Sequence, residues 1–226
     1  MEAFSQRFLP KYFFLIVIVA IIDVLSKVLV YSMIPLYATV PVISDFFYIY
    51  PILNETGLNP LAFSITEGNQ LFSILISLSG VILGVYIIFI RKTGLKKWLQ
   101  VLIGIAVHIG LSLLSGAVAE SFPVYGLNTH LVAVLTMIGP LFIAILFFCI
   151  SKRSYFKLVW AFVTAGGLGN FLSYFYPPFR VVDFLVLRPF GSLVFNIADI
   201  SAAIGFFILI ISPVVFLIKF VAGKTR

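Results

Sequence analysis

Charged residues are scarce in this chain of 226 residues: they make up 10% of it, whereas about 25% is usual for a soluble domain. Hydrophobic residues make up 62%. These two proportions exclude an ordinary soluble enzyme and predict an integral membrane protein. The apolar runs are long and continuous, which favours spanning helices over the alternating strands of an outer-membrane barrel.

Cysteine and histidine are scarce as well. The one cysteine, Cys149, lies inside an apolar run, so an internal disulfide is excluded. The two histidines, His108 and His130, are far apart in the sequence, so a metal-binding cluster is not expected. We therefore expect no metal and no cofactor. No small-residue cleavage site follows the first apolar run, so we expect a spanning helix there rather than a cleavable signal peptide.

Six apolar runs are each near the ~20 residues that cross a bilayer. They cover residues 12–34, 71–90, 98–118, 131–150, 158–176 and 196–220. A polar stretch, 35–69, follows the first run, and its alternating and β-branched pieces over 39–52 predict short strands. We expect an all-α polytopic membrane protein of about six transmembrane helices, built as one domain over 1–226. A small extracytoplasmic β-containing segment follows the first helix.

The basic residues fix the predicted orientation. With six spans, twelve of the 15 lysines and arginines fall on the side that holds both termini, whereas Arg180 and Arg188 fall on the other and Lys27 lies inside a span. By the positive-inside rule, the side with the twelve basic residues is predicted to be cytoplasmic. The net charge of +7 is therefore explained by topology, and we expect membrane lipids but no nucleic acid as partners.

Two carboxylates near the end of the chain are the main candidates for chemistry. Asp183 lies in the last outer link and Asp199 in the first turn of the last span, so both are expected near the outer membrane surface. Two adjacent carboxylates share a proton, and such a pair activates water and protonates a leaving group. The alternative is structural: Asn196 with Asp199 fits a helix cap, and Asp183 fits a solvated loop charge.

Other polar residues stand inside apolar runs. Asp23 and Lys27 are four residues apart on one helix face, which predicts a structural ion pair. Residues 166–170, Gly-Gly-Leu-Gly-Asn, combine small residues that let helices approach closely with an amide that needs partners near lipid.

At these residues the sequence resembles the lipoprotein signal peptidase (signal peptidase II) family. The shared motifs are Asp23 with Lys27, Asn-Glu-Thr-Gly at 54–57, Ala-Phe-Ser at 62–64, Gly-Gly-Leu-Gly-Asn at 166–170, Val-Val-Asp-Phe at 181–184 and Phe-Asn-Ile-Ala-Asp at 195–199. The resemblance covers residues 12–90 and 158–220. Since the family has four spans, it implies an inserted two-span hairpin at about 98–150.

The resemblance implies an intramembrane aspartyl endopeptidase of the bacterial cytoplasmic membrane. Its substrates would be diacylglyceryl-modified prolipoproteins, cut before the lipidated cysteine, and we expect a monomer. It implies Asp183 and Asp199 as catalytic residues. The implied substrate-binding residues are Asn54, Gly169, Asn170, Asn196 and Arg180.

One departure from the family pattern matters. The family continues Gly-Asn-x-x-Asp-Arg, whereas this chain has Ser173 and Tyr174 at the last two positions. The resemblance implies that the family arginine is a substrate-backbone ligand, so in this chain its role is either lost or taken over by another residue, for which Arg180 is the candidate. Two alternatives stay open: a catalytically altered paralogue that binds lipidated substrates, and a small transporter that uses Asp23, Lys27 and Asn170 as a polar path. The missing inverted repeat counts against the transporter.

Overall fold

The computed structural model describes residues 2–44, 46–54, 129–152, 154–188 and 193–224, together with a few single positions between 74 and 85. The predicted runs at 71–90 and 98–118, and the basic link between them, therefore lie almost entirely outside the described residues. The elements that are described are α1 (Glu2–Met33), β1 (Val40–Ile43), β2 (Phe47–Asn54), α4 (Thr129–Ile150), α5 (Ser154–Leu172), the 3-10 turn η2 (Ser173–Phe175), β3 (Val181–Leu187), β4 (Val194–Phe195) and α6 (Ile197–Lys224).

Long apolar helices dominate the described part of the chain. Three of them contain stretches long and apolar enough to cross a membrane, namely Lys11–Met33, Leu131–Ile150 and Ser154–Phe175. The predicted runs at 12–34, 131–150 and 158–176 are thereby confirmed as helices of spanning length. The run predicted at 196–220 is also helical, as α6. A total of six spans stays a prediction.

A four-stranded antiparallel sheet completes the fold, in the order β1-β2-β3-β4. The strands predicted within 39–52 are confirmed by β1 and β2. No strand was predicted from the sequence in residues 181–195, which contribute β3 and β4, two of the four strands. Asp183 is therefore not in an irregular link: it lies within β3, opposite Ile52 of β2.

The β3 sequence explains this result. Val-Val-Asp-Phe-Leu-Val-Leu is a seven-residue run of mainly β-branched and other apolar residues, which suits a pleated, buried strand. Its first four residues are buried. The alternative of a solvated loop charge at Asp183 was thus wrong, since the side chain is only 2% exposed.

α5 is the central helix of the bundle, in contact with α1, α4 and α6. Small residues allow its close approach to α6. A Cβ on Gly166 would collide with the carbonyl oxygen of Ala198, and a Cβ on Gly205 would lie 2.8 Å from the carbonyl oxygen of Val159. Such small-residue contacts are the usual means by which membrane helices pack without a hydrophobic driving force.

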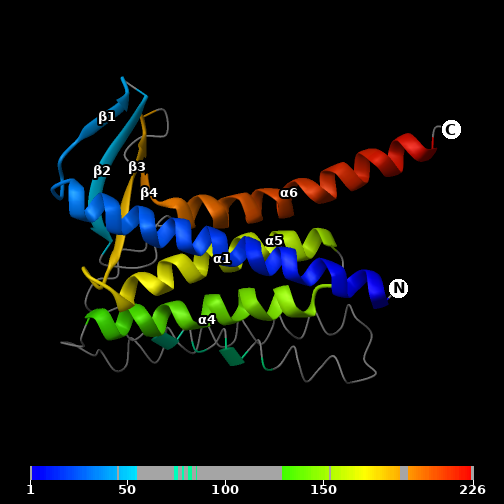
Figure 1. The fold of residues 1–226 in the computed structure, drawn as a ribbon. Helices are drawn as coiled ribbons and strands as arrows, with labels where there is room; N and C mark the ends of the chain where they lie inside the picture. The colour runs from blue at the N-terminus through cyan, green and yellow to red at the C-terminus, as the bar shows by residue number, and fades with distance from the viewer. Residues whose placement is uncertain are drawn as a thin grey trace.

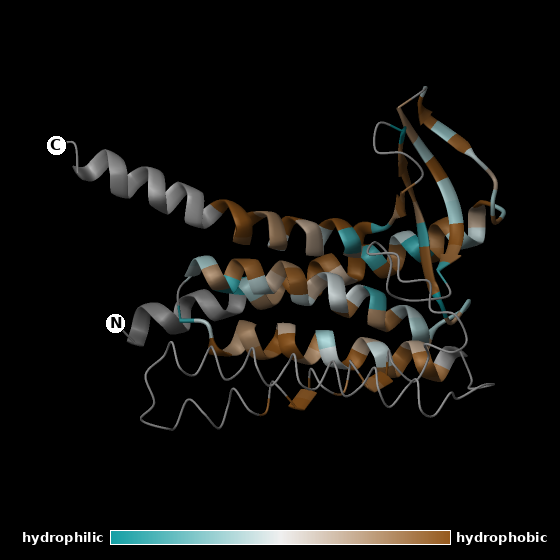
Figure 2. Ribbon diagram, turned by 180° about the vertical axis from the view of Figure 1, so that it is seen from behind, coloured by the Kyte–Doolittle hydropathy of each residue, from teal (hydrophilic) through white to brown (hydrophobic). Residues whose placement is uncertain are grey.

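The sheet lies at one end of the helix bundle, and the start of α1 and the end of α6 lie at the other (Figure 1). Figure 2 shows apolar colour along the helices and hydrophilic colour gathered where α6 meets the sheet. The polar groups of the described bundle are thus concentrated at the junction between helices and sheet, which is where β4 leads directly into α6.

Candidate active site

The two candidate aspartates come from different elements that meet at this junction. Asp183 is in β3, and Asp199 is the third residue of α6. One residue, Asn196, immediately precedes α6 and is completely buried. Its Nδ2 lies 2.5 Å from Oδ1 of Asp183, and its backbone N–H donates to Oδ2 of Asp199 at 3.1 Å. Both carboxylates are therefore hydrogen-bonded to the same asparagine.

Asp183 is enclosed by amide groups. Its second oxygen, Oδ2, accepts a hydrogen bond of 2.9 Å from Nδ2 of Asn54, the last residue of β2. The pKa of Asp183 is raised to about 7. Burial raises it most and the charge of Asp199 raises it as well, whereas the hydrogen bonds from Asn54 and Asn196 and the charge of Lys27 lower it. A carboxyl group with this pKa exchanges a proton readily near neutral pH.

Asp199 is held in a capping box. Oδ1 of Asn196 accepts a hydrogen bond of 3.0 Å from the backbone N–H of Asp199, while the Asp199 carboxylate accepts from the backbone N–H of Asn196. The other carboxylate oxygen accepts a hydrogen bond of 2.9 Å from Nδ2 of Asn170 on α5. Asp199 is therefore both part of the helix cap and a member of the aspartate pair, two interpretations that the sequence left as alternatives.

Beneath these groups lies the ion pair of α1. Nζ of Lys27 is 2.7 Å from Oδ2 of Asp23, and both side chains are fully buried. The same nitrogen donates to Oδ1 of Asn170 at 2.7 Å and to Oγ of Ser173 at 3.2 Å. The other oxygen of Asp23 accepts from the backbone N–H of Ala198, in the first turn of α6, at 2.7 Å. The ion pair thus joins α1 to α5 and to the start of α6.

Gly169 is required for this arrangement. A Cβ added there would lie 2.6 Å from Oδ2 of Asp23 and 3.2 Å from Cβ of Ala198. The residue does not reach out as a ligand. Its missing side chain instead lets α5 approach α1 and α6 at the level of the two aspartates.

Ser173 and Tyr174, the two residues expected from the sequence to depart from the family pattern, are both buried. Ser173, besides accepting from Lys27, donates to the carbonyl oxygen of Gly169 at 3.1 Å. Tyr174, 2% exposed, packs in an apolar cluster with Ala133 and Met137 of α4 and with Val181 of β3. The position of the family arginine therefore faces α4, a helix of the predicted insertion.

The structure brings the residues singled out from the sequence together around the aspartate pair. Seven others lie in the same cluster: the ion pair Asp23 and Lys27, and Asn54, Gly169, Asn170, Ser173 and Asn196. Arg180 directly precedes β3 and is half-buried; its role in substrate binding stays a prediction. Sequence reasoning missed two contacts, Asp23 with the start of α6 and Ser173 with Lys27. The one available signal was that a buried ammonium group needs more than one acceptor.

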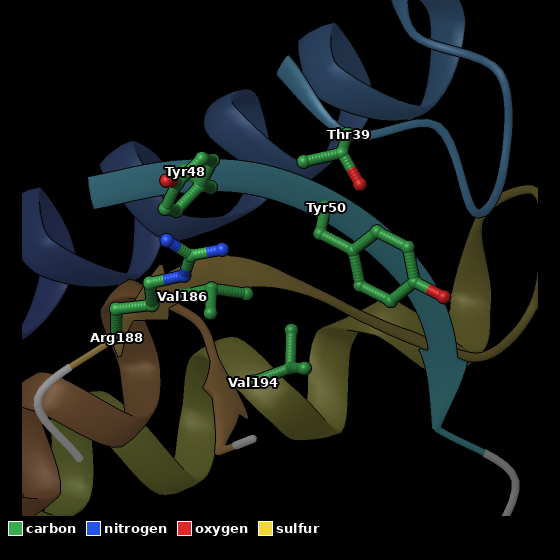
Figure 3. Close-up of a pocket in the computed structure, with 6 residues that line it drawn as sticks. All are labelled: Thr39, Tyr48, Tyr50, Val186, Arg188 and Val194. Atoms are coloured by element: carbon green, nitrogen blue, oxygen red, sulfur yellow. The ribbon is translucent and has the colours of Figure 1, made fainter. Parts of the chain in front are cut away.

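A shallow cavity of about 280 Å³ opens on the sheet, lined by Thr39, Tyr48, Tyr50, Val186, Arg188 and Val194 (Figure 3). The guanidinium of Arg188 lies over the ring of Tyr48, 5.4 Å from its centroid. Val186 is three residues from Asp183 on the same strand, so the two side chains point to opposite faces of the sheet. This cavity is therefore separate from the aspartate pair.

No group of three or more histidine, cysteine, aspartate or glutamate side chains within the described ranges is arranged to hold a metal ion. The polar cluster contains carboxylates, amides, one ammonium group and hydroxyls. Such groups can donate and accept hydrogen bonds, and carboxyl groups can exchange protons.

The model of the family "Signal peptidase (SPase) II" matches residues 15–120 and 114–215, which is most of the chain. The chain belongs to the signal peptidase II family. Signal peptidase II enzymes are membrane-bound hydrolases of bacterial lipoprotein maturation, and aspartic proteases by type. The family therefore makes this chain a membrane protease that acts on lipoprotein signal peptides, in agreement with its long apolar helices.

Two solved structures are similar to the chain, each described as a bacterial membrane enzyme. Each is 21% identical; the TM-scores are 0.47 and 0.48, over 90% and 95% of this chain and 92% of each of those chains. No curated protein matches the sequence.

Proposed function

We propose that this signal peptidase II family member cuts diacylglyceryl-modified prolipoproteins on the amino side of the lipidated cysteine, with Asp183 and Asp199 as its catalytic pair. The observation that carries the proposal is the shared attachment of both carboxylates to the buried Asn196. An ordinary helix cap needs only one of the two aspartates. The cap does not need the second carboxylate, Asp183, and burying a carboxyl group lowers the stability of the folded protein. We infer that Asp183 is kept for a function.

The surroundings of the two groups suggest their roles. Asp199 accepts a backbone N–H bond at the start of α6, where the helix dipole stabilises a carboxylate. Asp183, within β3, is the more buried of the two carboxyl groups, and its pKa is raised to about 7. We assign the base to Asp199, which takes a proton from the attacking water, and the acid to Asp183, which protonates the scissile carbonyl oxygen. The amine that leaves then receives a proton from the pair.

The place of the pair suits a lipid-anchored substrate. It lies where the helix bundle meets the sheet, and the termini of the chain lie at the opposite end (Figure 1). With the orientation deduced from the basic residues, this end faces outward and both termini are cytoplasmic. A diacylglyceryl group would stay in the bilayer while the peptide segment before it reaches the carboxylates.

Substrate contacts are assigned more narrowly than the sequence suggested. Asn54 and Asn196 each donate to a carboxylate in the described structure, so we propose that they position the catalytic pair first and touch substrate second. Arg180, beside β3, is our candidate ligand for the substrate backbone in place of the family arginine.

A second candidate follows from one specific observation. Tyr174 stands where the resemblance implies an arginine, and its side chain packs against α4. The guanidinium group that would bind substrate is therefore missing at this position. If that guanidinium were essential for turnover, the chain would bind lipidated prolipoproteins without cutting them.

The test is cleavage of a diacylglyceryl-prolipoprotein by the full chain in lipid vesicles, in wild type and in Asp183→Asn and Asp199→Asn. We expect each substitution to lower the rate by about 10²- to 10⁴-fold, as removal of a catalytic acid or base does. Asp45→Asn, a change at the remaining aspartate outside the two motifs and the ion pair, is the chemically matched control. Cleavage by either site variant at more than a tenth of the wild-type rate refutes the assignment. Binding without any cleavage by wild type favours the second candidate.

A further inference from the structure

Lys27 helps to fix the orientation of the Asn170 amide, together with Asn196, whose Nδ2 donates to the same oxygen at 3.1 Å. An ammonium group has three donors and no acceptor, so the atom of Asn170 that faces it must be the oxygen. The nitrogen of the same amide then points to Asp199, to which it donates. Were the amide reversed, its oxygen would face the carboxylate and repel it. The charge on α1 therefore acts on Asp199 through one intervening side chain.

Ser173 is the third acceptor of Lys27, and it is uncharged. The ammonium contacts one carboxylate, Asp23, one amide oxygen and the Ser173 hydroxyl. At a fully buried site the effective dielectric constant is far below that of water, so a single additional negative charge there acts over several ångströms. The hydroxyl fixes the position of Lys27 without adding such a charge.

We propose that Ser173 is a positioning residue for the aspartate pair: acting through Lys27 and Asn170, it holds the ammonium in place while leaving part of its positive charge to act on Asp199. The proposal rests on the proposed function for its consequence in catalysis. The resemblance implies an aspartate at position 173 in the family, where this chain has serine. The proposal therefore predicts that the pH dependence of cleavage differs between this chain and members with that aspartate.

Hydrogen bonds link Ser173 to four charged or titratable groups. Lys27 of α1 contacts Ser173 directly and also binds Asp23. Asn170 and Asn196 continue the hydrogen bonds from Lys27 to Asp199 of α6 and Asp183 of β3. The hydroxyl of Tyr176 lies 3.3 Å from Oγ of Ser173. α4 has no charged residue between Leu131 and Ile150. A carboxylate introduced at this position would therefore contact the Lys27 ammonium and join a hydrogen-bonded network that already holds three carboxyl groups.

The experiment is the pH dependence of cleavage for wild type, Ser173→Asp, Ser173→Asn and Ser173→Ala in vesicles of one lipid composition. An added negative charge favours the protonated form of nearby carboxyls, so Ser173→Asp is expected to move both limbs of the pH profile upward by about one unit. Ser173→Asn, which has the same shape without the charge, is expected to move them by less than a third of that shift. Ser173→Ala is expected to lower kcat without moving the limbs, because it removes the contact but changes no charge.

An equal shift in Ser173→Asp and Ser173→Asn, or a shift in neither, overturns the proposal. A second measurement separates this proposal from the proposed function. The protonated-carboxyl stretching band of the full chain, labelled at aspartate, is titrated by infrared spectroscopy in wild type, Ser173→Asp and Ser173→Asn. If wild type does not cleave, the proposed function fails, while an upward shift of the titration in Ser173→Asp alone still supports the role of Ser173.

Discussion

Replacement of Lys27 by methionine tests whether the buried ion pair supports the site. Methionine has a similar length and no charge, so the change removes the ammonium from Asp23, Asn170 and Ser173 together. Asp23 then remains as a fully buried carboxylate without its cation. Breaking a buried pair in this way costs about 3–5 kcal/mol. In a chain of this size each kcal/mol lowers the unfolding midpoint by about 2–4 °C, so we expect a fall of about 10 °C.

The compensating variant is Asp23→Asn with Lys27→Met. It removes both charges, while the asparagine oxygen at position 23 still accepts the N–H of Ala198 at the start of α6. Since the main cost of the single change is an uncompensated charge, the double variant is expected to recover at least half of the lost stability. Lys152→Met, at an exposed position in the turn between α4 and α5, is the matched control and should change the midpoint by less than about 2 °C.

The assay is thermal unfolding in one detergent or lipid mixture, followed by cleavage measured well below each midpoint. Lys27→Met should cleave more slowly even where it is folded, since Asn170 then loses its charged donor and is oriented only by its bonds to Asn196 and Asp199. The reasoning is refuted if Lys27→Met is as stable as wild type. It is refuted equally if the double variant is no more stable than the single one, because the buried charge would then not be the cause.

Two further predictions come from the same cluster. Gly169→Ala places a Cβ 2.6 Å from Oδ2 of Asp23 and should destabilise the protein by about 2 kcal/mol. Gly167→Ala is the control: its Cβ meets only the flexible end of the Leu141 side chain at 3.3 Å, so it should change stability by less than about 1 kcal/mol. Equal unfolding midpoints for the two variants would contradict the packing argument. The pKa of Asp183 is raised from 3.8 to about 7, so the folded state binds a proton more tightly than the unfolded chain; the stabilisation is complete below pH 4 and is lost as the pH rises to about 7. A rise of about three pKa units corresponds to about 4 kcal/mol, so wild type should lose on the order of 4 kcal/mol over this range relative to Asp183→Asn. Parallel stability curves for the two proteins would contradict this prediction.

The spanning helices are the part of the fold that the sequence predicts well. A continuous apolar run of about 20 residues has few structural alternatives in a bilayer, so its position follows from composition alone. The ends are less certain: α1 begins at Glu2, ten residues before the predicted run, because helical structure continues beyond the apolar stretch. The placement of the predicted insertion at 98–150 stays untested, although its described helix α4 packs along α5.

The sheet was only half predictable, because strand pairing depends on distant residues. β2 pairs with β3, about 130 residues further along the chain, and nothing local in either segment specifies this partner. The β-branched run around Asp183 is itself a strand signal, but its position between two apolar helices made a link the simpler interpretation. The same limitation applies to Ser173, whose contact with Lys27 spans 146 residues.

The site also shows why a structural and a catalytic interpretation of one motif need not exclude each other. Asn196 and Asp199 form the hydrogen bonds of a capping box, and these bonds hold Asp199 at a fixed place in the first turn of α6. The amide nitrogen of Asn196 is not used by the cap, so it remains free to bind Asp183 and Oδ1 of Asn170. Positioning a proton-transfer pair requires rigid attachment of both members, and a helix cap supplies such rigidity for one of them. The cap is therefore part of the means by which β3 and α6 present their carboxylates together, and a substitution at Asn196 should impair helix stability and proton transfer at once.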